Sequence, residues 1–322
     1  MVRSRVMLSS LIPDDTVIII GGVLLIILLL MWLFVRKRRE KELKTERLNA
    51  QKESSGIKTC EPNKDKLTIS EKHRYRVGKL HNVGKREKQQ DAFAVSDVED
   101  QDLCETKGVM AIVADGMGGL TDGDKISSMV TLSLFRHFHE REHSANLGNT
   151  LLEMLGEANS EVNSFLGDRL KMCGSTLVAG IVKGNLFHWI SVGDSHIYLY
   201  RNGNLLQLNK EHVYAVELDV KAANGEISRE EALRDKQRGA LTSYLGMGRL
   251  EQVDRSLKPL ELQHGDRLLL MTDGVFGTLN DEQIVMAMRR PVEDSAKWME
   301  EEIQKADKPN QDNYTAVILE YC

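Results

Sequence analysis

Short apolar runs that come in neighbouring pairs dominate the chain after about residue 74. They are partly β-branched and are bounded by Gly, Asp or Asn, which is typical of buried β-strands. These runs are residues 108–113, 176–182, 186–192, 197–201, 267–271 and 316–319. Only residues 183–185 separate the second run from the third, a connection short enough for a hairpin. The order therefore predicts antiparallel sheets rather than strict βαβ alternation.

Longer segments without internal proline space their apolar residues three and four apart, which is typical of helices. They are residues 124–143, 147–166, 228–237, 281–290 and 293–305. We therefore expect an α+β fold in which helices pack outside antiparallel sheets. One domain of about 250 residues accounts for this whole part of the chain, residues 71–322.

Five aspartates lie at the ends of apolar runs. They are Asp91, Asp115, Asp194, Asp273 and Asp312. Any one of them is most simply explained as a turn residue, because Asp-Gly and similar pairs are common in turns. Several carboxylates at one rim of a sheet, however, are tolerable only when a cation neutralises them. The set therefore predicts a cation site.

The kind of cation follows from the ligands. Oxygen ligands without nearby Cys or His select Mg²⁺, Mn²⁺ or Ca²⁺, and the carbonyl of Gly116 is accessible to such an ion. Two ions about 3.5 to 4 Å apart would activate a bridging water and hold a phosphoryl group. Arg86 lies five residues before Asp91 and could bind the phosphate, although a surface charge within the basic run 85–88 is the simpler explanation. The pattern predicts hydrolysis of phosphate esters.

Charge is distributed unevenly along the chain. Residues 1–90 carry 20 basic and 10 acidic side chains, whereas residues 91–322 carry 23 basic and 38 acidic ones. Binding to nucleic acid needs Lys and Arg to neutralise phosphates. The acidic part of the chain therefore argues against nucleic acid as a partner and suits a domain that binds hard cations.

Residues 17–35 form an uncharged, mainly apolar run. As a helix this run is about 28 Å long, close to the roughly 30 Å of a bilayer's hydrocarbon core. A cleaved signal peptide is the alternative, but the next four residues are basic rather than small. Seven basic residues within 36–47 predict that the chain after this helix is cytoplasmic.

We therefore expect a single-pass protein of the cell (inner) membrane. Residues 1–16 would be a short extracytoplasmic segment, 17–35 a transmembrane helix, 36–70 a basic juxtamembrane stem and 71–322 the cytoplasmic domain. Whether the stem binds anionic lipid or only fixes the orientation of the helix is open.

Six blocks of sequence resemble one family in their order and spacing. They are GKREKQQDAF, VADGMGG, GSTLVAGIV, VGDSHIYLYRNGNLLQLNKEH, LLLMTDGVFGTLNDEQI and PNQDNYTAVILEY. They cover about residues 75–321 and are similar to the metal-dependent serine/threonine protein phosphatases of type 2C, the PPM family. The resemblance implies two stacked antiparallel β-sheets flanked by helices on both faces. Residues 224–246 resemble the family's variable flap and the helix-loop after it.

The resemblance also implies a site and a reaction. A centre with two Mn²⁺ or Mg²⁺ ions is implied at Asp91, Asp115, the Gly116 carbonyl, Asp273 and Asp312. Arg86 matches the arginine that binds phosphate. The implied reaction is single-step hydrolysis of phosphoserine or phosphothreonine by a metal-bridging water. The implied partners are phosphoproteins and a cognate serine/threonine kinase.

The chain departs from the family pattern at three places. Gln90 replaces an acidic residue that many members have before the first aspartate. Met117 stands where animal members have a histidine, and in this respect the chain resembles the bacterial branch. Some members bind a third metal, for which Asp168 is the nearest candidate despite its poor spacing. Asp194 and Asp124 are alternatives, or structural turn and cap residues.

The adjacent Ser195 and His196 would point to opposite faces of a strand and so cannot form a nucleophilic relay. We expect a membrane-anchored serine/threonine phosphatase, with a catalytically silent relative that binds phosphoproteins or scaffolds a complex as the alternative. Hydrolysis of small phosphate esters would use the same metal chemistry, and the sequence does not separate it from protein dephosphorylation.

Overall fold

The computed structural model describes residues 74–118 and 122–322. The chain divides into two units, Met1–Ile69 and Ser70–Cys322, and all described residues belong to the second. The predicted extracytoplasmic segment, transmembrane helix and stem, residues 1–70, lie outside the described residues. Within the described part, every helix is too short or too polar to cross a membrane.

One sheet has five antiparallel strands in the order β1-β12-β11-β7-β8. Their bounds are β1 Tyr75–Asn82, β12 Tyr314–Tyr321, β11 Arg267–Met271, β7 His196–Arg201 and β8 Asn204–Gln207. The first and last strands of the domain pair along their whole length, from Tyr75 opposite Tyr321 to Asn82 opposite Tyr314. This pairing brings the two ends of the domain together.

The second sheet has the order β10-β6-β5-β3-β2, with β4 paired to β3 and β9 to β6. The bounds are β2 Asp91–Val95, β3 Val109–Met117, β4 Gly174–Ser175, β5 Leu177–Lys183, β6 Leu186–Val192, β9 Asp254–Arg255 and β10 Leu260–Glu261. The predicted hairpin is confirmed, because β5 and β6 pair antiparallel from Leu177 opposite Val192 to Lys183 opposite Leu186.

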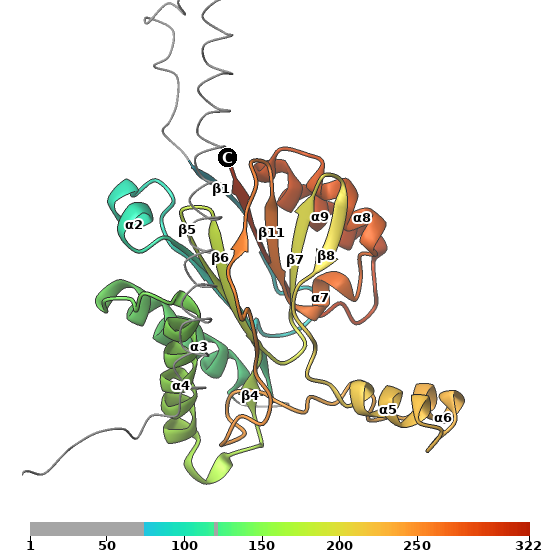
Figure 1. Ribbon diagram of the computed structural model, residues 1–322. Coiled ribbons are helices and arrows are strands. Elements are labelled where there is room, and N and C mark those ends of the chain that lie inside the picture. The colour runs from blue at the N-terminus through green and yellow to red at the C-terminus, as the bar shows by residue number, and fades with distance from the viewer. Residues whose placement is uncertain (1–73, 119–121) are drawn as a thin grey trace, which may run out of the picture. The chain divides into compact units, whose positions relative to one another are not determined.

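Strand β3 shows why the layers form. Its residues Met110, Ile112 and Ala114 pack against helices α3 (Gly123–Glu140) and α4 (Leu147–Leu166). The residues between them, Val109, Ala111 and Val113, point to the other sheet and pack with its side chains in a second core. A third core lies between the five-stranded sheet and helices α8 (Asp281–Met288) and α9 (Val292–Ala306). Figure 1 shows the resulting helix-sheet-sheet-helix order, and the predicted pair of antiparallel sheets is confirmed.

The remaining helices are short or peripheral. They are α2 Gln101–Thr106, η2 Gly167–Arg169, α5 Tyr214–Ala223, α6 Arg229–Arg234 and α7 Asp273–Phe276. The predicted helix 228–237 is reduced to α6, which begins with a capping box between Ser228 and Glu231. Helices α5 and α6 project from the sheets in Figure 1, and Leu218 is the one buried residue of α5.

Candidate active site

The strand register brings the predicted aspartates to one end of the two sheets. Asp91 is the first residue of β2 and lies directly opposite Asp115 of β3. Asp273 begins α7 immediately after β11 and Thr272, and Asp312 precedes the neighbouring strand β12. The two sheets therefore each contribute two carboxylates.

The pKa values of these carboxylates show that they share one environment. Burial, together with the charges of Asp273 and Asp312, raises the pKa of Asp91 to about 7. Burial, and then the charges of Asp91 and Asp273, hold the pKa of Asp115 well above its ordinary value. The pKa of Asp273 is raised by burial and next by Asp312. Carboxylates that raise one another's pKa in this way call for a positive charge between them.

Two carboxylate oxygens lack the partners that buried oxygens normally have. Asp91 is 5% exposed, and its Oδ2 accepts hydrogen bonds of 2.8 Å from the hydroxyls of Thr272 and Thr315. Its Oδ1 is buried without a hydrogen-bond partner, and so is Oδ1 of Asp273. Leaving such atoms unsatisfied is costly, whereas a hard cation satisfies both.

The donors are of the right kind for Mn²⁺ or Mg²⁺, although they form no closed cage. Across residues 74–118 and 122–322, no group of three or more His, Cys, Asp or Glu side chains is arranged to hold a metal ion. Mg²⁺ in proteins commonly keeps several water ligands and uses one or two carboxylates. Oxygen-only donors at an open rim therefore fit an ion that takes the rest of its coordination from water.

Gly116 lies where β3 meets the start of α3. A Cβ atom there would be 2.1 Å from the carbonyl oxygen of Gly123 and 2.6 Å from that of Gln90. The amide of Gly116 donates to the same Gln90 oxygen at 3.0 Å. The position therefore excludes any side chain, and its backbone is fixed next to Asp115.

Arg86 reaches the same rim from the loop between β1 and β2. Its Nη2 donates to Oδ2 of Asp312 at 2.6 Å, and about half of the arginine side chain is exposed. The structure thus brings the predicted phosphate-binding group next to one of the predicted metal ligands.

The candidates for a third metal differ in position. Asp168 is exposed in η2, and no described contact joins it to the other aspartates. Asp194, between β6 and β7, lies closer to the site, because its charge helps to raise the pKa of Asp115. Burial raises the pKa of Asp194 itself to about 6. Asp124 lies in the first turn of α3, where acidic residues are common.

Ser195 and His196 have separate partners. The Ser195 hydroxyl is hydrogen-bonded to that of Thr176 at 2.7 Å. Nε2 of His196 contacts Glu211 at 2.5 Å, and its ring stacks on Phe276. These contacts do not join Ser195 to His196.

Four polar residues of the site were missed from sequence. They are Thr272, Thr315, Gln311 and Asn313, which are next to the predicted ligands or follow them within three residues. Their proximity in sequence was the available signal, but their hydrogen bonds join segments that are distant in sequence.

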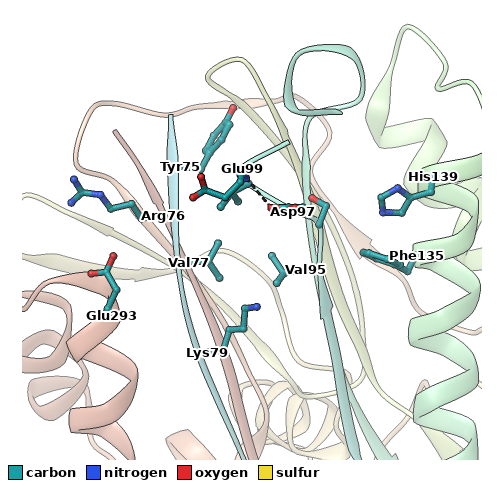
Figure 2. A pocket seen from close by; sticks show the side chains of 12 residues that line it. Tyr75, Arg76, Val77, Lys79, Val95, Asp97, Glu99, Phe135, His139 and Glu293 are labelled. Atoms are coloured by element: carbon teal, nitrogen blue, oxygen red, sulfur yellow. Dashed lines mark hydrogen bonds between the residues drawn. The ribbon is translucent and has the colours of Figure 1, made fainter. Parts of the chain in front are cut away.

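A separate groove of about 820 Å³ lies between strands β1 and β2 and contains none of the predicted site residues. Figure 2 shows Val77 of β1 and Val95 of β2 facing each other in it, with Phe135 and His139 of α3 on one side. It is therefore distinct from the aspartate rim.

Comparison with known proteins gives the rim its context. The model of the family described as protein phosphatase 2C matches residues 78–317. The serine/threonine protein phosphatase PstP of Mycobacterium tuberculosis is 32% identical over 219 residues, which cover 65% of this chain but 39% of that protein. The serine/threonine phosphatase stp of Listeria monocytogenes is 30% identical, with 66% of this chain and 84% of that protein covered.

Solved structures of bacterial proteins have the same fold. The catalytic domain of PstP in complex with two manganese ions has a TM-score of 0.60 and 27% identity, covering 76% of this chain and 97% of that one. The phosphatase MsPP of Mycobacterium smegmatis, in complex with cacodylate, has a TM-score of 0.61 and 30% identity, with 77% and 98% covered. Because the family model reaches from β1 into β12 and includes Arg86 and all four aspartates of the rim, the chain belongs to the protein phosphatase 2C family.

Proposed function

We propose that the chain is a metal-dependent serine/threonine protein phosphatase that hydrolyses phosphoserine and phosphothreonine in proteins. The observation that carries the proposal is the shared rim, where two buried carboxylate oxygens without partners lie among mutually repelling aspartates beside Arg86. The two manganese ions of the PstP catalytic domain support Mn²⁺ or Mg²⁺ as the cofactor. The proposed ligands are Asp91, Asp115, the Gly116 carbonyl, Asp273 and Asp312.

The roles of the residues follow from their contacts. When bound, the two ions would polarise the phosphate and activate a water. The aspartates would hold the ions, and the hydroxyls of Thr272 and Thr315 keep Asp91 in one orientation. Arg86 has five N–H donors, of which the described hydrogen bonds engage one, so that the others can bind phosphate oxygens. Met117 has no proton to donate, so the leaving serine or threonine oxygen would take its proton from water.

The sequence of residues 17–47 supports a second part of the proposal, which concerns location. An apolar run long enough to span a bilayer, followed by a basic cluster, favours a single-pass anchor in the cell membrane with the phosphatase domain in the cytoplasm. A cognate serine/threonine kinase is proposed as the enzyme that supplies the substrates.

Activity of the full-length chain in mild detergent tests the function. Hydrolysis of a phosphothreonine peptide should require Mn²⁺ or Mg²⁺, stop with chelator and collapse in Asp273→Asn. The same change at the exposed Asp281 of α8 should leave activity unchanged. Faster turnover of nucleotides or small esters than of phosphopeptides would point to a different substrate class. A folded protein that binds Mn²⁺ but hydrolyses none of these would favour the catalytically silent alternative.

A further inference from the structure

Two buried amide side chains lie on either side of Asp312. Gln311 is 6% exposed and Asn313 is 4% exposed. An amide in such a position is stable only when its donors and acceptor find partners, and those partners are then fixed relative to one another. The partners of these two amides belong to different halves of the site.

Asn313 holds both ends of the loop that carries Arg86. Its Nδ2 donates to the carbonyl oxygens of Val83 at 2.8 Å and Lys88 at 3.0 Å. Its Oδ1 accepts a hydrogen bond of 2.8 Å from the amide of Gln90. One side chain thus uses both N–H groups and its oxygen to close this loop around the arginine.

The same loop rests on the backbone beside Asp312. The amide of Lys85 donates to the carbonyl oxygen of Gln311 at 2.9 Å. Gly84 has a φ of +61°, and a Cβ atom there would lie 2.3 Å from the carbonyl oxygen of Asp312. This close approach leaves the loop little freedom once Asn313 has closed it.

Gln311 holds the helix that begins with Asp273. Its Nε2 donates to the carbonyl oxygen of Gly274 at 3.0 Å, and its Oε1 accepts from the hydroxyl of Thr278 at 2.9 Å. A Cβ atom on Gly274 would lie 1.9 Å from the carbonyl oxygen of Asn313. Helix α7 and the segment around Asp312 are therefore packed backbone against backbone.

From these contacts we propose that Gln311 and Asn313 are positioning residues with separate tasks. Asn313 places Arg86 for the phosphate, and Gln311 places Asp273 for the metal. The proposal rests on the phosphatase function proposed above. It predicts two different defects, because a displacement of about 1 Å in a positioned group can cost as much as 10²-fold in rate.

The test compares two variants of the full-length chain in mild detergent. Asn313→Ser should raise two constants by about tenfold each: KM for a phosphothreonine peptide and the Kd of inorganic phosphate. The Kd is measured by calorimetry on Mg²⁺-loaded protein. Mn²⁺ affinity should be unchanged. Gln311→Met should weaken Mn²⁺ binding by about tenfold, with KM close to that of the unmodified chain at saturating Mn²⁺. Asn159→Ser is the matched control, since Asn159 is also a buried amide and donates to Gly248 from α4.

A double-mutant cycle shows whether Asn313 acts through Arg86. In an Arg86→Ala background, Asn313→Ser should cause almost no further loss of phosphate binding. Additive losses would overturn the assignment of Asn313, as would an equal loss of Mn²⁺ affinity. Unchanged Mn²⁺ affinity in Gln311→Met would overturn the assignment of Gln311.

Two measures keep the proposal testable if a variant unfolds or the chain proves inactive. Asn313→Leu keeps the approximate size and removes both donors without adding a charge, so phosphate binding should weaken while Mn²⁺ affinity does not. A loss of Mn²⁺ affinity instead contradicts the proposal. For Gln311, Thr278→Val removes the hydroxyl donor and should weaken Mn²⁺ binding in the same direction. An unmodified chain without metal-dependent turnover would refute the proposed function, whereas direct Mn²⁺ and phosphate binding would still test the positioning roles.

Discussion

Asp91 is held by two hydroxyls that come from the opposite sheet. Thr272 follows β11 and Thr315 belongs to β12, whereas Asp91 opens β2 of the other sheet. Both hydroxyls stabilise the ionised carboxylate and so lower its pKa, while burial acts more strongly in the other direction. The two hydrogen bonds to one oxygen leave the other free to bind an ion at a fixed place.

Removal of one hydroxyl should therefore weaken metal binding more than it weakens the fold. Thr315→Val preserves the shape of the side chain but removes one donor to Asp91, and we expect the Kd for Mn²⁺ to rise about tenfold. Calorimetric titration of Mn²⁺ measures this. Thr131→Val in α3 is the control, because that hydroxyl is buried and has no hydrogen-bond partner. Unchanged Mn²⁺ affinity in Thr315→Val would show that the hydroxyl does not orient the ligand.

The raised pKa of Asp91 predicts how stability varies with pH. A carboxyl whose pKa is higher in the folded state contributes stability that is fully present below its ordinary pKa of 3.8 and is lost as pH rises through about 7. The Tm of the chelator-treated protein should therefore fall across this range. Mn²⁺ binds the ionised form, so the gain in Tm from Mn²⁺ should widen from pH 5 to pH 8.

Differential scanning fluorimetry with Mn²⁺ and with chelator measures the gain in Tm that Mn²⁺ gives. Asp91→Asn removes the titrating group, so the variant should show a flatter dependence of Tm on pH without metal. A gain in Tm from Mn²⁺ that stays constant between pH 5 and pH 8 would contradict the prediction.

At the scale of elements, the site depends on the close contact between the end of β3 and the start of α3. Gly116 ends the buried part of β3 so close to the first residue of α3 that backbone meets backbone. Strand β2 pairs with β3, and Asp91 lies opposite Asp115 in this pairing. A shift of α3 would therefore move a ligand pair and the adjacent carbonyl together.

Gly116→Ala should consequently destabilise the domain by about 1–3 kcal/mol, because the atoms that a Cβ would meet are backbone and cannot rotate away. Urea unfolding measures the loss. Gly156→Ala in α4 is the matched control, since a Cβ there meets nothing within 4 Å and alanine should stabilise the helix by roughly 0.5–1 kcal/mol. Equal stability of the two variants would contradict the close contact.

The elements that could be predicted from sequence are those whose burial produces a regular pattern. Residues 147–166, 186–192 and 267–271 match α4, β6 and β11, because each packs an apolar face or is buried on both sides. Strand β1 was missed because its sequence, YRVGKLHN, mixes polar with apolar residues and forms no apolar run. Its place in the fold comes from pairing with β12, which is distant in sequence. Helix α5 was missed because a single buried leucine leaves no apolar stripe.

The aspartates of the site were predictable because each ends or precedes an apolar run. The hydroxyls and amides that orient them were not, since a threonine or asparagine beside a strand is usually a local cap or turn residue. Their function depends on which distant segments the two sheets bring together, and a local pattern does not contain that information.

At the scale of the whole molecule, the unit Ser70–Cys322 contains its own cores between and outside the two sheets. It should therefore fold without residues 1–69. We predict that a fragment of residues 70–322 keeps the Tm of the full-length chain within a few degrees and hydrolyses phosphopeptide in solution.

The full-length chain should remain with membranes after carbonate extraction, whereas the fragment should be released. Fractionation followed by protease treatment of spheroplasts measures both properties. Recovery of the full-length chain in the soluble fraction, or digestion of its phosphatase domain from outside, would contradict the predicted anchor or its orientation.

The pairing of β1 with β12 also determines when the proposed site can be completed during synthesis. Asp312 follows its partner Arg86 by 226 residues, and strand β12, which pairs with β1, is made after Asp312. At about 5–20 residues per second, on the order of ten to forty-five seconds therefore pass between the synthesis of Arg86 and that of Asp312. A chain that ends before Asp312 lacks one of the proposed metal ligands and the strand that pairs with β1, so we expect it to show no phosphatase activity.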